Sequence, residues 1–221
     1  RAAGRDVISM AVGEPDFSAP EVVQAAAVER VRSGDVRYTA AAGTPSLRRA
    51  VAEPLGARRG VPFTPEEVTI CHSAKHALSG AIFALVEEGD EVLVPLPAWA
   101  SYFDLVRVAG ATPVLVPPDR RDGVRPDLAA LARAVTPKAR AVMINSPNNP
   151  SGYVFTREEI EAVAQLAVER NLWILSDEIY RALVYEGGEA PSPASLSEEA
   201  RPRTAIIGGA SEALAMTGDR I

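Results

Sequence analysis

The sequence predicts an α/β fold with a mostly parallel central sheet flanked by helices. From about residue 67 onward, short β-branched runs alternate with longer amphipathic stretches. The strand candidates are "EVTI", "EVLVP", "ATPVLV", "RAVMIN" and "LWILSDE", with a helix-like stretch between each and the next. Such alternation is typical of a parallel sheet, because each crossover helix returns the chain to the same edge.

Local helix signals support these boundaries. Thr156 followed by Glu159 forms a capping box, Asp127 can cap a helix that opens at residue 128, and Thr44 precedes a first-turn proline. Pro54 lies inside a helical stretch, so we expect a break there, because an interior proline removes a backbone hydrogen bond. The Gly, Pro and Ser content of residues 187–202 predicts a surface loop.

Length and composition allow one large domain, or one domain with a fragment of another. The chain has 221 residues, of which 47% are hydrophobic, and its first residue is not methionine. We expect a helix at residues 20–32 within an N-terminal arm or part of a small domain (residues 1–34). Residues 35–221 then form an incomplete large domain, truncated at its C-terminus.

Charge and cysteine content exclude several classes of protein. The formal charge of −6 is spread over mixed-sign sequence without a basic stripe, so a nucleic-acid partner is not expected. The single Cys71 rules out an internal disulfide framework. Without a long apolar run or a secretory leader, the sequence predicts a cytoplasmic protein that does not enter membranes.

Polar motifs follow the predicted strands, where open α/β sheets bind ligands. In "CHSAKHAL", the Ser73 hydroxyl and the amides of Ala74 and Lys75 can hold a phosphate, although a capped helix explains them equally well. His72 and His76 in this stretch are four residues apart. They have no acidic partner or third histidine, which disfavours a metal site.

A ring-binding set follows the later strands. Asp177, at a strand end, can keep a ring nitrogen protonated, while Asn149 and Tyr180 can bind a phenolic oxygen of the same ring. Trp99 can stack on the ring face. Each residue alone has a simpler explanation, as a turn, a solvated strand end or a packing residue. Their occurrence together favours a ring site.

Five motifs then indicate a family. "VGEPDF", "YTAAAGTPSLRRAV", "PNNPSG", "SDEIY" and "AMTGDRI" occur in the order and at the spacing of the class I/II aminotransferases. The chain resembles these fold-type I pyridoxal-phosphate enzymes, of which aspartate aminotransferase is one, over nearly its whole length. The resemblance implies pyridoxal 5′-phosphate as cofactor, amino acid and 2-oxo acid substrates, and a role in amino acid metabolism and biosynthesis. It also implies a homodimer with shared active sites.

The resemblance assigns roles to single residues. Gly13 lies beside the substrate carboxylate, with Trp99 and Asn149 also at the substrate, and Tyr38 reaches the cofactor phosphate of the partner subunit. The other cofactor-binding positions are Ser73, Ala74 and Lys75 at the phosphate, Trp99 on the ring face, Asn149 and Tyr180 at the ring oxygen, Asp177 at the ring nitrogen, and Arg220 paired with the phosphate.

The chain departs from the family pattern where the chemistry is most demanding. Glu212 stands at the position of the lysine that binds the cofactor covalently and moves the proton. Gly209 replaces a common phosphate-binding serine, and Asp219 replaces an aromatic residue. The arginine that grips the substrate carboxylate in relatives belongs to a C-terminal domain absent from this sequence. We therefore expect impaired transamination.

Three functions stay open. The first is an aminotransferase fragment or variant whose catalytic residues are Asp177, Tyr180 and the altered position Glu212. The second is a non-catalytic pseudoenzyme that acts as a binding partner. The third is another pyridoxal-phosphate reaction on the same fold, by a lyase, decarboxylase or oxidase. Only Lys75 and Lys138 are available as substitute amines, and Lys75 is the nearer to the predicted crevice.

Overall fold

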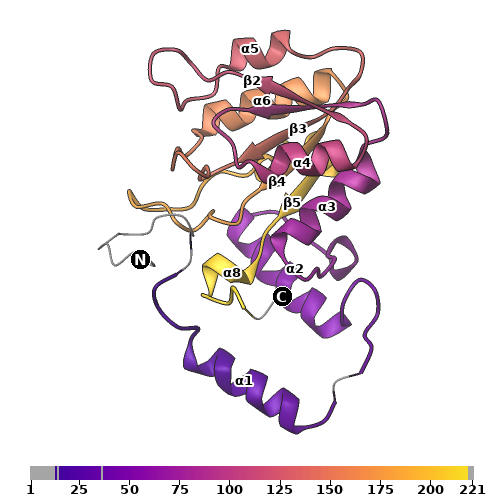
Figure 1. Cartoon of the computed structure of the whole chain (residues 1–221). Helices are drawn as coiled ribbons and strands as arrows, with labels where there is room; N and C mark the ends of the chain where they lie inside the picture. Colours follow the sequence, from indigo (N-terminus) through magenta and orange to yellow (C-terminus); the bar gives the residue numbers. More distant parts are fainter. Residues whose placement is uncertain (1–12, 14, 36, 219–221) are drawn as a thin grey trace, which may run out of the picture.

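The computed structural model describes residues 13, 15–35 and 37–218 (Figure 1). The described chain alternates helices and strands, as predicted. The elements, in chain order, are α1 (Glu21–Arg32), α2 (Pro45–Arg59), the 3₁₀ helix η1 (Pro65–Glu67), α3 (Ala74–Leu85), β1 (Glu91–Pro95), α4 (Ser101–Val108), β2 (Thr112–Val116), α5 (Leu128–Arg133), β3 (Ala139–Asn145), α6 (Arg157–Glu169), β4 (Trp173–Asp177), α7 (Pro193–Leu196), the 3₁₀ helix η2 (Arg201–Arg203), β5 (Thr204–Ile207) and α8 (Ala210–Ala213).

The five strands form one parallel sheet in the order β2-β1-β3-β4-β5. The order reverses direction at β1, since β2 lies on one side of it and β3 on the other. Helices cover both faces: α3 and α4 pack on one face, and α5 and α6 on the other (Figure 1). The predicted fold class is therefore confirmed.

The side chains of the central strand β3 contribute to the hydrophobic cores on both faces of the sheet. Its Val142 and Ile144 contact the layer of α5 and α6, while Ala141 and Met143 contact the layer of α3 and α4. This alternation follows from the two-residue period of a strand. Because both faces are covered, the strand is apolar nearly throughout, as is usual in parallel sheets.

The predicted helix starts are confirmed. The Thr156 hydroxyl accepts from the Glu159 amide at 3.2 Å, and the Glu159 carboxylate accepts from the Thr156 amide at 2.9 Å, which completes the capping box of α6. Asp127 caps α5 through the amide of Ala130 at 2.8 Å. Thr44 caps α2. Local chemistry thus sets where these helices begin.

The expected strand "EVTI" is wrong. Glu67 belongs to η1, and the residues after it join no ladder. The Ile70 amide donates instead to the carbonyl of Ala42 at 3.0 Å, and the Val68 amide donates to that of Pro65 at 3.2 Å. An extended segment becomes a strand only when a neighbour completes its hydrogen bonds, and no strand within the described residues pairs with this one.

The expected break at Pro54 is also wrong, because α2 continues from Pro45 to Arg59. Ala52 and Gly56 are buried on either side of the proline, and Arg59 pairs with the buried Glu178. Contacts on both sides of Pro54 therefore hold the helix together despite the missing amide.

Residues 187–202 are more ordered than a surface loop. They contain α7, which packs on α6, and the start of η2. Ala190, Ser192 and Ala200 are almost fully buried. Small residues are common in loops, but they also allow close packing, so composition alone misjudged this segment.

Helix α1 is confirmed near its predicted limits and buries no residue. It lies apart from the sheet and its covering helices (Figure 1). The division into an arm (residues 1–34) and a large domain (residues 35–221) stays a prediction. Among the described residues, no helix has the length and apolar character needed to cross a membrane.

Candidate active site

The carboxyl ends of the strands bring together residues from distant parts of the sequence. In the sheet register, Asn145 at the end of β3 lies beside Asp177 at the end of β4, and Asp177 lies beside Ile207 at the end of β5. The loop after β3 carries Asn149, and the segment after β5 carries Glu212. One edge of the sheet therefore collects the predicted ring-binding residues.

Asp177 is the buried centre of this edge, with 6% of its surface exposed. Its Oδ2 accepts from the Tyr102 hydroxyl at 2.6 Å, and its Oδ1 accepts from the Ile179 amide at 3.2 Å. Burial raises the pKa of Asp177, and the charges of Glu212 and Glu178 act in the same direction, while its two hydrogen bonds oppose them. Asp177 is therefore a buried residue, and the simpler explanation of a solvated strand end is wrong.

Asn149 and Tyr180 lie next to Asp177. The Asn149 amide donates to Asn145 Oδ1 at 2.6 Å, and the Asn145 side chain donates to the carbonyl of Asp177 at 3.0 Å. Burial raises the pKa of Tyr180, with added effects of Glu212 and Asp177, and a hydrogen bond from the Asn149 side chain lowers it. The Asn149 side chain therefore lies close enough to the Tyr180 phenol to affect its pKa, as expected for two groups predicted to share one ligand oxygen.

Glu212, on the short helix α8, completes the group. Its charge raises the pKa of both Asp177 and Tyr180, so its carboxylate acts on both residues. The Glu212 Oε2 atom is buried and has no hydrogen-bond partner among the described residues. A buried acceptor without a donor is costly, so this atom is free to accept a hydrogen bond from a water molecule or a ligand.

The predicted phosphate turn is a helix N-terminus. Ser73 caps α3, and its hydroxyl accepts from the His76 amide at 3.2 Å. The Lys75 ammonium lies 4.8 Å from the centre of the Trp99 ring, which itself meets the Tyr102 ring edge-on at 5.4 Å. The turn is thus connected through Trp99 and Tyr102 to Asp177.

Gly209 lies between the phosphate turn at the start of α3 and the loop after β4. A methyl group at Gly209 would lie 3.4 Å from Ile179 Cδ1 and 3.7 Å from Ala74 Cβ. The segment after β5 therefore runs between the start of α3 and the loop after β4. A side chain larger than methyl at residue 209 would project at this junction.

The two histidines beside the turn interact with each other. Their rings stack with centroids 5.5 Å apart, and His76 Nδ1 accepts from the amide of His72 at 3.3 Å. No group of three or more metal-binding side chains gathers in the part of the chain that the structure describes.

Two predicted residues, Gly13 and Tyr38, lie apart from this group. Gly13 is exposed, with no atom of the described residues within 4 Å of where a Cβ would lie. The Tyr38 side chain is fully exposed. Arg220 lies outside the described residues, as does Asp219.

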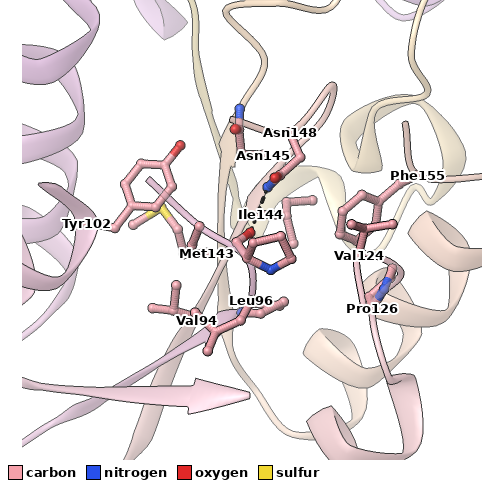
Figure 2. Close-up of a pocket in the computed structure, with 13 residues that line it drawn as sticks. Val94, Leu96, Tyr102, Val124, Pro126, Met143, Ile144, Asn145, Asn148 and Phe155 are labelled. Atoms are coloured by element: carbon pink, nitrogen blue, oxygen red, sulfur yellow. Dashed lines mark hydrogen bonds between the residues drawn. The ribbon is translucent and has the colours of Figure 1, made fainter. Parts of the chain in front are cut away.

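Sequence reasoning missed Tyr102, which holds the central carboxylate. Figure 2 shows this residue at a small hollow, with Met143 and Asn145 beside it. On the loop after β3, the Asn148 side chain donates to the carbonyl of Pro97 at 3.0 Å, which ties the loops after β1 and β3 together. Tyr102 follows Trp99 by one helical turn, but this spacing alone does not reveal a partner 75 residues away.

A parallel α/β sheet with a buried acid, an amide, a phenol and an indole at its carboxyl edge defines a domain suited to an aromatic ligand. Comparison with known proteins identifies the family to which this domain belongs. The family model for aminotransferase class I and II matches residues 5–221, and the chain belongs to this family.

Curated relatives and solved structures agree with this family assignment. The chain is 40% identical over 221 residues to an aspartate aminotransferase of Bacillus sp. (strain YM-2), and 42% identical to a probable aspartate/prephenate aminotransferase of Thermus aquaticus. A double mutant of Thermus thermophilus aspartate aminotransferase superposes with a TM-score of 0.94 at 41% identity, covering 99% of this chain. The chain spans about 56% of the length of the Bacillus relative and of this structure.

The residues fit part of the cofactor on which this family depends, pyridoxal phosphate. The buried Asp177 suits a protonated ring nitrogen, and the capped start of α3 beside the side-chain-free Gly209 suits a phosphate. Glu212 does not fit covalent attachment, because a carboxylate cannot form the carbon–nitrogen double bond that a lysine amine forms with an aldehyde. The geometry is therefore suited to non-covalent binding.

Proposed function

We propose that this chain is the cofactor-binding part of a pyridoxal-phosphate aminotransferase that uses an amino acid and a 2-oxo acid, with transamination impaired at Glu212. The observation that carries the proposal is the buried Asp177 held by Tyr102 and flanked by Asn149, Tyr180 and Glu212. The names of the relatives favour aspartate as an amino donor.

Each residue then has a definite task. Bound pyridoxal phosphate supplies an electron-withdrawing ring, which stabilises negative charge at the substrate Cα. Asp177 keeps the ring nitrogen protonated, and Tyr102 holds that carboxylate in place. Asn149 and Tyr180 bind the ring oxygen, Trp99 covers the ring face, and the start of α3 binds the phosphate, with Arg220 as a further phosphate partner.

Proton transfer is the task that this chain performs poorly. A free lysine amine can take a proton from Cα and return it to the cofactor. The Glu212 carboxylate can accept a proton, but it is a weaker base than an amine. It also places negative charge next to Tyr180, at the ring oxygen.

The full active site also needs parts outside the described residues. We propose a homodimer in which the exposed Tyr38 reaches the partner's phosphate site, with Gly13 beside the substrate carboxylate. The exposure of both residues in the single chain supports this assignment, because a residue that serves another subunit, or a part of the protein outside this sequence, is left without contacts here.

Restoring the lysine tests the proposal. We expect the Glu212→Lys variant, mixed with pyridoxal phosphate and reduced with borohydride, to carry the cofactor mass on the peptide containing residue 212. The unaltered protein and the Glu212→Gln variant should show no adduct there. Peptide mapping is decisive because only Lys75, Lys138 and the N-terminal amine compete.

The outcomes separate the alternatives. An adduct on Lys75 in the unaltered protein would mean that a displaced lysine replaces the missing one. No adduct at residue 212 in the lysine variant, together with no cofactor binding by either protein, would favour the pseudoenzyme. Products of the lysine variant assayed with aspartate would distinguish transamination from elimination, decarboxylation or oxidation.

A further inference from the structure

The starting observation is the unpaired carboxylate oxygen of Glu212. Its Oε2 atom is buried and accepts no hydrogen bond from the described residues. None of the ion pairs in the described part of the chain includes Glu212. A desolvated carboxylate of this kind is stabilised by a cationic donor more than by any neutral group.

The described residues supply no such donor to Glu212 Oε2. Burial is the main cause of the raised pKa values of Asp177 and Tyr180, and the negative charge of Glu212 raises both further. Two cations of the described residues have other partners: Arg59 pairs with Glu178, and Lys75 lies over the Trp99 ring. The described residues therefore leave a negative site without a counter-charge.

We propose that Glu212 makes this site select the amine form of the cofactor, pyridoxamine phosphate, over the aldehyde form. The inference rests on the proposed function, since it assumes that the ring and phosphate bind as described above. The amine form carries an ammonium group that can donate up to three hydrogen bonds, and Glu212 Oε2 would accept one of them. The aldehyde offers only an acceptor oxygen, which a carboxylate repels.

A lysine at this position has the opposite preference. Its amine bonds covalently to the aldehyde and, when protonated, repels the ammonium of the amine form. The replacement of lysine by Glu212 thus reverses both the charge and the hydrogen-bonding character of the position. The site changes from one that captures an aldehyde to one that retains an amine.

Binding measurements without turnover test this inference. Equilibrium dialysis of the unaltered protein is carried out with pyridoxamine phosphate, pyridoxal phosphate and the 4′-deoxy analogue, which has a methyl group at the same carbon. We expect the amine form to bind about tenfold or more tightly than either other ligand, as for a charge-assisted hydrogen bond at a buried acceptor. The Glu212→Gln variant should bind the amine form and the methyl analogue about equally.

The Glu212→Lys variant provides the opposite control, because it should retain the aldehyde through dialysis and bind the amine form less tightly. Equal binding of all three ligands by the unaltered protein, or a preference for the aldehyde, would overturn the inference while leaving the proposed cofactor site intact. Failure to bind any of the three, with an unchanged melting curve, would contradict the inference and the proposed function together.

Discussion

Asp177 illustrates how a single buried residue joins stability to function. Burial favours the neutral carboxyl, and the negative charges of Glu212 and Glu178 favour it further, which raises its pKa despite two hydrogen bonds. Between its ordinary pKa and this raised value, the folded state holds more protons at this site than the unfolded state. The stability that this group contributes is therefore lost as the pH rises.

Replacing Asp177 with asparagine should therefore stabilise the protein near neutral pH. The neutral amide keeps a partner for the Tyr102 hydroxyl and removes the buried charge. We expect the melting temperature of Asp177→Asn to rise by roughly 2–4 °C at neutral pH, the shift for about 1 kcal/mol in a chain of this size. The gain should vanish below about pH 4, the ordinary range of an aspartate.

Calorimetric scans across this pH range check the prediction, with Asp104→Asn as the control, because Asp104 is largely exposed. Cofactor binding should weaken in the Asp177 variant only. A lower melting temperature at neutral pH would show that the two hydrogen bonds outweigh the burial of the charge.

At the scale of elements, the segment between α2 and α3 is positioned by contact and not by a ladder. Gly43 has φ +95°, and a Cβ there would lie 2.6 Å from Ile70 Cγ1. Ile70 in turn donates its amide to the carbonyl of Ala42. This close approach holds the chain three residues before Ser73, so it also places the phosphate turn.

A comparison of Gly43 with Gly60 separates the energetic cost of a positive φ from the cost of the close contact with Ile70. Gly60, the C-cap of α2, has φ +67° with open space around it, so Gly60→Ala should cost about 1–2 kcal/mol from conformation alone. Gly43→Ala should cost a further 1–3 kcal/mol or so because the side chain of Ile70 must move. Urea unfolding measures both values. Equal losses would mean that Ile70 adjusts freely.

Helix α6 and the segment "EVTI" show which element predictions succeed. The start of α6 was predictable because Thr156 and Glu159 satisfy the first-turn amides within a few residues. The strand character of "EVTI" depended on a neighbouring strand, which no local pattern reports. The helix through Pro54 continues for a similar reason, since Arg59 is anchored by a residue 119 positions away.

At the scale of the whole molecule, one buried carboxylate ties distant segments to the site. Glu178 follows Asp177 directly and pairs with Arg59 at the end of α2. The hydroxyls of Ser176 and Ser192 donate to its other oxygen. The pair joins α2 to the end of β4, next to the loop that carries Tyr180.

Breaking this pair should be strongly destabilising. Arg59→Met leaves the buried Glu178 carboxylate without its main cation, for which we expect a loss of about 3–5 kcal/mol. Arg157→Met, which breaks an exposed pair with Glu161, should change stability by no more than about 0.5 kcal/mol. Urea unfolding of both variants tests the difference, and comparable losses would show that the Arg59 pair is no stronger than a surface pair.

Short-range patterns in the amino-acid sequence predict the alternating α/β order and the helix starts, because each signal lies within a few residues of chain. The roles of Ser73, Trp99, Asn149, Asp177 and Tyr180, and the departure at Glu212, come from the family resemblance and stay predictions. The folded chain alone shows that Tyr102 holds Asp177, that Arg59 pairs with Glu178, and that Glu212 Oε2 is buried without a described partner. Those contacts form across 75 residues or more, or depend on burial, and burial is a property of the folded chain alone.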